Sequence, residues 1–290
     1  MVFDMPVQAT NTLYSLSPGY QRGVNESDYE VIVVENSSER NLQPPLGANV
    51  RYLRRDESGK SPAAAVNAGV AAARGSAVAV MVDGARMVTP GVVLNLLRAQ
   101  RIARCPVVSV PGYHLGDQLH QDAAASGYSA EQEQSLLAGL DWRADGYRLF
   151  TRAVPSASCA DGYLVPIAES NCVGVPKKVF DRLGGFDESF VSTGGGFVNL
   201  DFYRRAVDLP RATLVVLPGE GAFHQFHGGV TTGAAGTDHD AIVEQMRQEY
   251  QRLRGRAYQS PAKSPVLLGE VPPAAAPFLE RSAAALAGRS

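Results

Sequence analysis

Short apolar runs alternate with helical patterns along the first third of the chain. Residues Tyr29–Val34 are β-branched and apolar on both faces, which is typical of a strand covered on both sides of a sheet. Similar runs predict three more strands, at Val50–Leu53, Ala77–Val82 and Val107–Val110. Helical patterns lie between them, at Ser61–Ala73 and Thr89–Arg104, each with a proline near its start. This order predicts an α/β fold with a mostly parallel sheet and helices on both faces.

The rest of the chain carries weaker patterns. Helices are predicted at Ser129–Leu140, Pro176–Leu183, Leu200–Val207, Asp238–Arg254 and Leu279–Leu286. Further strands are predicted at Tyr147–Phe150, Tyr163–Val165 and Thr213–Leu217. At the start, Met1–Phe3 would be a very short strand with residues 4–6 as its loop. Either the sheet tolerates such a stub, or the natural protein begins upstream of this methionine.

Polar residues follow two of the predicted strands. Glu35 and Asn36 end one strand, and Asp83 ends another. Ligands of open α/β sheets bind outside the carboxyl ends of the strands, so these side chains are expected at one edge of the sheet.

Composition narrows the class of protein. The chain has 27 Lys+Arg against 29 Asp+Glu, a net charge of -2, so no basic field favours nucleic acid. Its 3 cysteines form no CxxC pair, so neither a disulfide framework nor a structural zinc site is indicated. No apolar run is long enough to span a membrane, and no secretory signal is visible. A cytoplasmic protein is therefore predicted.

Four segments in this order resemble glycosyltransferases of the GT-A fold, in particular the large family 2. They are Tyr29–Ser38, Ser61–Gly75, the strand that ends at Asp83, and Asn171–Glu188. The family transfers a sugar from a nucleotide sugar to an acceptor hydroxyl, usually with a divalent metal. The resemblance implies a nucleotide-sugar-binding half at 1–112, an acceptor and catalytic half at 113–232, and a C-terminal helix with a Pro/Ala-rich tail at 233–290.

The resemblance also implies a set of residues for the donor, a UDP- or GDP-sugar. They are Phe3, Glu35, Asn36, Lys60, Asn67, Asp83, Gly84 and Arg86. Where the family has a second acidic residue, this chain has Asn36, whose amide can still read a base edge or else form a plain turn. Lys60 either faces the donor phosphates or is a solvated lysine.

The family motif Asp-x-Asp is incomplete, because Asp83 is followed by Gly84 and Ala85. Two interpretations stay open. His224 or His227 completes a site for Mn²⁺ or Mg²⁺ with Asp83, and imidazole favours manganese. Alternatively, Arg86 holds the donor diphosphate directly.

The general base is displaced or absent. An inverting transfer needs a carboxylate to deprotonate the acceptor, and the family commonly supplies it from a Glu-Asp pair. Gly196 and Phe197 occupy the matching place, so the candidates are Asp201 and Glu169, unless the enzyme retains configuration. Three aromatic residues either stack on the sugar or belong to the core: Trp142, Tyr147 and Tyr163.

The sequence therefore predicts a glycosyltransferase, and a catalytically degenerate module on the same fold is the alternative. A nucleotidyltransferase or dinucleotide enzyme is disfavoured, since the loop after the first strand lacks a glycine-rich turn. The acceptor, a sugar, lipid or small molecule, stays open, as does a location at the inner membrane surface. The tail is either an arm of a homodimer or a simple packed tail.

Overall fold

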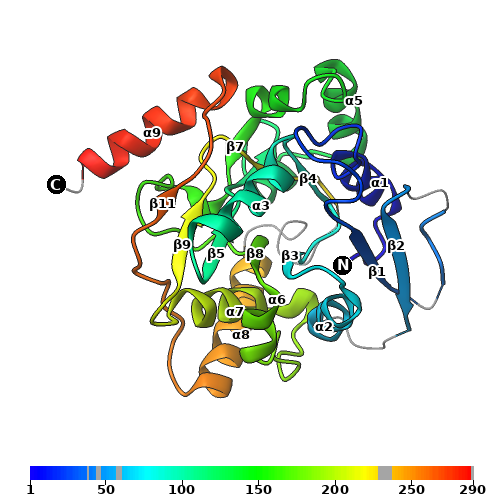
Figure 1. Cartoon of the computed structure of the whole chain (residues 1–290). Coiled ribbons are helices and arrows are strands. Elements are labelled where there is room, and N and C mark those ends of the chain that lie inside the picture. Colours follow the sequence, from blue (N-terminus) through cyan, green and yellow to red (C-terminus); the bar gives the residue numbers. More distant parts are fainter. Residues whose placement is uncertain (38, 44–46, 57–60, 228–236, 289–290) are drawn as a thin grey trace.

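The computed structural model of the chain is an α/β protein, and it describes residues 1–37, 39–43, 47–56, 61–227 and 237–288 (Figure 1). The helices of this described part are α1 (Pro6–Ser15), α2 (Ala63–Ala72), α3 (Val92–Ile102), α4 (His120–Ala125), α5 (Ala130–Leu140), α6 (Lys177–Arg182), α7 (Val198–Val207), α8 (Thr237–Arg254) and α9 (Ala276–Ala287). Short 3-10 helices are η1 (Gly146–Arg152), η2 (Ala157–Cys159), η3 (Thr193–Gly195) and η4 (Pro273–Ala275). The strands are β1 (Val31–Asn36), β2 (Val50–Arg55), β3 (Ala77–Met81), β4 (Arg86–Val88), β5 (Pro106–Ser109), β6 (Gly112–Leu115), β7 (Ala153–Pro155), β8 (Cys172–Pro176), β9 (Thr213–Val216), β10 (Ala222–His224) and β11 (Val266–Leu267).

The strands form mixed sheets, so the prediction of a mostly parallel sheet was wrong. Strands β1 and β2 pair in parallel, and the other two sheets have the orders β4-β10-β6-β7 and β11-β9-β5-β8-β3. Strand β8 is antiparallel to both neighbours, β3 and β5, and β10 is antiparallel to β4. An apolar run indicates a strand but not its direction. Strand β8 enters between β3 and β5 from a long irregular segment, which the alternating pattern of the first third does not predict.

The N-terminal segment forms more structure than expected. Val2 makes one parallel bridge to Glu35, so the predicted stub exists as a single bridge. The expected loop gives way at once to α1, which begins at Pro6, a residue whose fixed φ suits the first turn of a helix. Helix α1 packs along β4, where Ser15 Oγ accepts the Val88 N–H at 3.0 Å.

Two predicted strands were wrong. Tyr147–Phe150 lies in η1, where the Asp145 carboxylate accepts the Tyr147 N–H and begins the turn. Tyr163–Val165 is assigned to no strand. The predicted helices were confirmed, although some of their ends differ. Helix α5, predicted from its spacing, begins at Ser129 with a capping box to Gln132, whereas α2 begins after Pro62 and not at a Ser61 cap.

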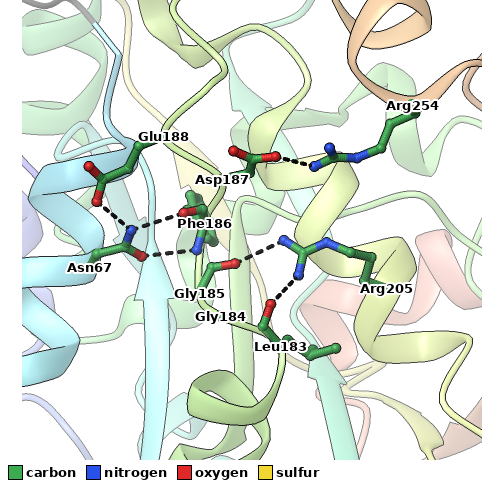
Figure 2. A pocket seen from close by; sticks show the side chains of 9 residues that line it. All are labelled: Asn67, Leu183, Gly184, Gly185, Phe186, Asp187, Glu188, Arg205 and Arg254. Carbon is green, nitrogen blue, oxygen red and sulfur yellow. Dashed lines mark hydrogen bonds and ion pairs between the residues drawn. The ribbon is translucent and has the colours of Figure 1, made fainter.

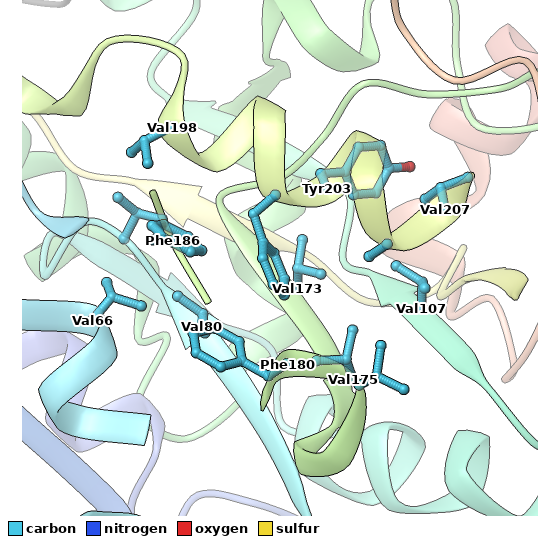
Figure 3. Close-up of a cluster of buried hydrophobic side chains, with 14 of the residues drawn as sticks. Val66, Val80, Val107, Val173, Val175, Phe180, Phe186, Val198, Tyr203 and Val207 are labelled. Atoms are coloured by element: carbon cyan, nitrogen blue, oxygen red, sulfur yellow. The ribbon is translucent and has the colours of Figure 1, made fainter. Parts of the chain in front are cut away.

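The largest core lies between the five-stranded sheet and helices α2, α6 and α7 (Figure 3). Val80 and Val173, opposite each other on β3 and β8, meet Val66 of α2 and Phe180 of α6. Their β-branched side chains suit a sheet face that is fully covered. This core fixes the strands that lead to Asp83.

A second, aromatic core lies under the four-stranded sheet. Tyr113 of β6 and Phe223 of β10 stack with ring centroids 5.2 Å apart, and Phe150 and Phe278 close the cluster. Trp142 is 1% exposed and packs edge-on against Tyr20, so the option of sugar stacking by Trp142 was wrong. Tyr163 is equally enclosed, at 2% exposed.

Helix α9 extends away from the body toward the C-terminus (Figure 1). Its first turns pack through Phe278 and Ser282, whereas Leu286 near its end is 43% exposed. Of the helices in the described ranges, none is both long enough and apolar enough to cross a membrane.

Candidate functional site

Asp83 lies in the turn after β3, and its carboxylate is oriented by that turn. Oδ1 accepts the Ala85 N–H at 2.9 Å, which leaves Oδ2 directed at two histidines. His224 Nε2 lies 2.7 Å from Oδ2, and His227 Nε2 lies 3.2 Å from it. The structure therefore brings together the three residues that the sequence analysis named as possible metal ligands.

The two histidine nitrogens also face each other. His224 Nε2 and His227 Nε2 are 3.1 Å apart, and all three ligand atoms lie within 4.8 Å of one another. Neighbouring ligands of a six-coordinate ion with bonds of about 2.1 Å are separated by about 3 Å. The spacing and the donor set thus fit one divalent cation, held by two imidazoles and one carboxylate.

Strand β10 positions His224 between two other polar residues. His224 is opposite Arg86 on β4 and opposite His114 on β6, so the three side chains form a row on one face of the sheet. The preceding row, Met87, Phe223 and Tyr113, faces the aromatic core. His224 is the last residue of this strand.

Burial controls the charges in this row. Burial, and then the Arg86 charge, lowers the pKa of His224 to about 3, although Asp83 opposes the shift. Burial lowers the pKa of His114 to about 2, and the neighbouring His224 is the second-largest cause of this shift. Burial alone would raise the pKa of Asp83, but His224 and His227 hold it well below its usual value. At neutral pH, Asp83 is therefore a carboxylate, and His224 and His114 are neutral.

Arg86 is the cation of this row, and it is 7% exposed. Its Nε and Nη1 are buried and have no hydrogen-bond partner among the described residues. A buried guanidinium without a counter-charge is costly, so this position favours an anion.

The residues predicted for the nucleotide partly gather beside Asp83. Val2 bridges to Glu35, and a side chain at Gly84 would meet Val2 at 2.7 Å, so glycine allows this close packing. Phe3 is 43% exposed next to this bridge, and Asn36 is 2% exposed at the end of β1. Lys60 lies outside the described residues.

Glu35 is committed to its own loop rather than open to a ligand. Its carboxylate accepts the Tyr52 hydroxyl at 2.5 Å and the Asn41 and Leu42 N–H groups at 3.1 and 3.3 Å. Burial, then the bond to Glu35, raises the pKa of Tyr52 to about 12, so the phenol stays a donor.

Asn67 lies in a different place, the pocket of Figure 2. Its amide donates to Phe186 O and Glu188 Oε1, both at 2.9 Å, and its carbonyl accepts the Phe186 N–H. Arg205 and Arg254 hold the other side of the same turn, through Gly185 O and Asp187. This pocket shares no lining residue with the Asp83 group, and its polar groups bind one another.

The two candidate bases are enclosed by protein donors. Asp201, 1% exposed, accepts Arg205 Nε at 2.7 Å and Arg254 Nε at 2.6 Å. Glu169, 0% exposed, accepts the hydroxyls of Ser156 and Ser158 and the N–H groups of Asn171. In the described ranges neither carboxylate has a bond to the Asp83 group, and the role of base stays a prediction for both.

Sequence reasoning missed His114 and His120. Four of the chain's 5 histidines gather here as two pairs, and His120 of one pair is 104 residues from His224 of the other. The scarcity of histidine was the available signal, but only the pairing of β6 with β10 shows that they meet.

Comparison with known proteins agrees with the class that the resemblance implied. Residues 11–147 match the family model described as Glycosyl transferase family 2. Asp83 and Arg86 lie inside this match, and His224 and His227 lie beyond it. No curated protein matches the chain.

Several solved structures are similar to the chain at low identity. S. aureus TarS 1-349 in complex with UDP-GlcNAc shares 14% identity at a TM-score of 0.49, covering 98% of this chain and 70% of that one. Mannosyltransferase PcManGT from Pyrobaculum calidifontis, in complex with GDP-Man and Mn2+, shares 13% at 0.49, covering 99% and 73%. For TarS 1-349 alone the identity is 13% and the TM-score 0.47, and this chain spans 64% of that chain's length.

Proposed function

We propose that the protein is a glycosyltransferase that moves a sugar from a nucleoside-diphosphate sugar to an acceptor hydroxyl. The observation that carries this proposal is the convergence of Asp83, His224 and His227 in a chain whose residues 11–147 match the glycosyltransferase family 2 model. The division of the chain at residues 112 and 232 belongs to the same proposal.

The arrangement of lone pairs supports a cation at the three ligands. His224 Nε2, His227 Nε2 and Asp83 Oδ2 form a triangle with sides of 2.7 to 3.2 Å. Whichever tautomers the two neutral rings adopt, at least one side of such a triangle brings two lone pairs or two N–H groups together. A cation removes this repulsion, and two imidazole ligands favour Mn²⁺ over Mg²⁺.

The chemistry of the transfer needs positive charge at this place. Negative charge develops on the leaving nucleoside diphosphate, and a metal or fixed cations stabilise it. Arg86 is next to His224 in the row and has unused donors, so we assign to it a second contact with the donor diphosphate. In this proposal, the metal at Asp83 and the Arg86 guanidinium both contact the diphosphate, although the sequence analysis gave them as alternatives.

The first experiment is a thermal-shift screen of UDP, GDP, TDP and CDP, each with and without Mn²⁺. A ligand at 100 times its Kd stabilises the native state by about 2.7 kcal/mol, which raises Tm by about 5 °C in a chain of this size. We expect one base to give this shift, and most of it to depend on Mn²⁺.

Asp83→Asn tests the assignment, because it keeps the shape of the side chain and removes its charge. The Mn²⁺-dependent part of the shift should vanish, whereas Asp117→Asn, an exposed carboxylate, should behave as wild type. A wild-type shift that ignores Mn²⁺ would leave Arg86 as the holder of the diphosphate and contradict the metal site.

A non-catalytic module on the same fold is the second candidate. The observation that favours it is the enclosure of both candidate bases, Asp201 and Glu169. Release of nucleoside diphosphate from the preferred nucleotide sugar separates the two. A transferase releases it in the presence of acceptor or slowly to water, and a binding module does not.

A further inference from the structure

His120, the first residue of α4, lies directly behind the candidate metal ligand His224. The two Nδ1 atoms are 3.1 Å apart, and His120 is 0% exposed. On its other side, His120 Nε2 lies 3.1 Å from Leu115 O and 3.6 Å from Glu133 Oε2. His120 therefore connects a backbone carbonyl and a buried carboxylate to the back of His224.

The partners of His120 decide where the protons of the two rings lie. Leu115 O and the Glu133 carboxylate can only accept, so His120 Nε2 carries a proton. The Nδ1 of neutral His120 is then an acceptor, and His224 Nδ1 must donate to it. Neutral His224 keeps a lone pair at Nε2, the atom that faces Asp83 and His227.

The backbone of His120 acts on a second histidine in the same way. Its N–H donates to His114 Nδ1 at 2.8 Å, so neutral His114 carries its proton at Nε2. One residue thus selects opposite tautomers for its two neighbours: His224 with a free Nε2, and His114 with an Nε2–H donor.

Glu133, on α5, fixes the segment that carries the ligands. Its two carboxylate oxygens accept the Phe226 N–H at 2.8 and 2.9 Å, between His224 and His227 in the chain. The Phe226 ring packs edge-on against His120, with centroids 5.4 Å apart. Backbone, ring and carboxylate contacts together hold His120 at one orientation.

We propose that His120 is a positioning residue that presents the Nε2 lone pair of His224 to a divalent cation. The inference rests on the proposed metal site and adds a residue behind the ligands, on a segment far from them in the sequence. Partners of this kind orient the ring and strengthen the ligand, and their loss typically weakens metal binding about 10–100-fold.

The test is Mn²⁺ binding, measured by electron paramagnetic resonance of free Mn²⁺ without nucleotide. We expect His120→Leu to raise the Kd about 10–100-fold. His120→Asn should bind much more like wild type, because its amide oxygen can accept the His224 Nδ1–H. Val175→Ala shortens a side chain in the core of the five-stranded sheet and serves as a control for lost stability. This variant should keep the wild-type Mn²⁺ affinity.

The outcomes separate this inference from the proposed function. If the wild type binds no Mn²⁺, the metal site itself fails. If the wild type binds, Asp83→Asn does not, and His120→Leu binds like wild type, the role of His120 is overturned while the metal site stands.

A second measurement serves if His120→Leu does not fold. In Zn²⁺-loaded wild-type protein, a nitrogen-15 imidazole spectrum should show a slowly exchanging proton on His224 Nδ1, and His120→Asn should preserve it. A rapidly exchanging His224 Nδ1–H in the wild type would contradict the bond to His120.

Discussion

Arg86 shows how a single residue can be unfavourable for the fold and useful for the site. The guanidinium is 7% exposed, and two of its nitrogens have no partner in the described part of the chain. Neutral His224 lies beside it in the sheet, and His114 lies one strand further. The attraction that would offset its desolvation must come from a ligand.

We expect Arg86→Met to stabilise the free protein by about 1–3 kcal/mol, because it replaces an unpaired buried charge with an apolar side chain of similar length. The same variant should bind the preferred nucleoside diphosphate more weakly but its nucleoside equally well. Urea unfolding and calorimetric titration measure the two effects. A less stable variant with unchanged diphosphate affinity would contradict the role of Arg86.

At the scale of elements, Asp201 connects two helices and a turn. It lies in the first turn of α7, and Arg254, near the end of α8, binds both Asp201 and Asp187. Arg205 binds Asp201 and the carbonyls of Leu183 and Gly185. The contacts hold the turn shown in Figure 2, which is also where Asn67 binds.

We expect Asp201→Asn to lower the free energy of unfolding by about 3 kcal/mol, since it leaves two arginines facing a neutral amide in a buried place. Asp208→Asn, at the C-terminal end of the same helix, is the matched control. The Asp208 side chain is half exposed in its pair with Arg204, so the loss of this pair should cost at most about 0.5 kcal/mol. Denaturant midpoints measure both changes, and equal effects would contradict a structural centre at Asp201.

Local elements were predicted best where a chemical signal marks their ends. Helix α5 has its capping box at Ser129, and α6 ends before Gly184 and Gly185, whose φ values of 73° and 68° suit glycine. Strand β10 was missed because three residues between glycine-rich stretches of the sequence carry no periodicity. Its alternation, Phe223 inward and His224 toward the site, appears only once β4 and β6 are placed beside it.

At the scale of the whole molecule, the site depends on pairing that no local pattern specifies. The sequence predicted that Asp83 and Glu35 end strands at one edge, and it named His224 and His227 as ligands. It did not predict that β8 runs against its neighbours, or that His114 and His120 join the group. Those features follow from the order of strands, which is decided by the cores of the assembled sheets.

The separation of the ligands along the chain has a kinetic consequence. Asp83 and His224 are 141 residues apart, and they meet only after β10 has joined β4 and β6. Contacts across such a long loop form late, so the folding transition state should lack the metal-binding triangle. Mn²⁺ should therefore act on the lifetime of the native state and not on the speed of its formation.

In stopped-flow experiments with denaturant, Mn²⁺ at 100 times its Kd should slow unfolding about 100-fold and leave the refolding rate unchanged. Faster refolding with Mn²⁺ would show instead that the two ends of the site meet early. With the ligands distributed in this way, a bound ion is a reversible cross-link between the first and last thirds of the chain. This cross-link forms only after the chain between them has folded.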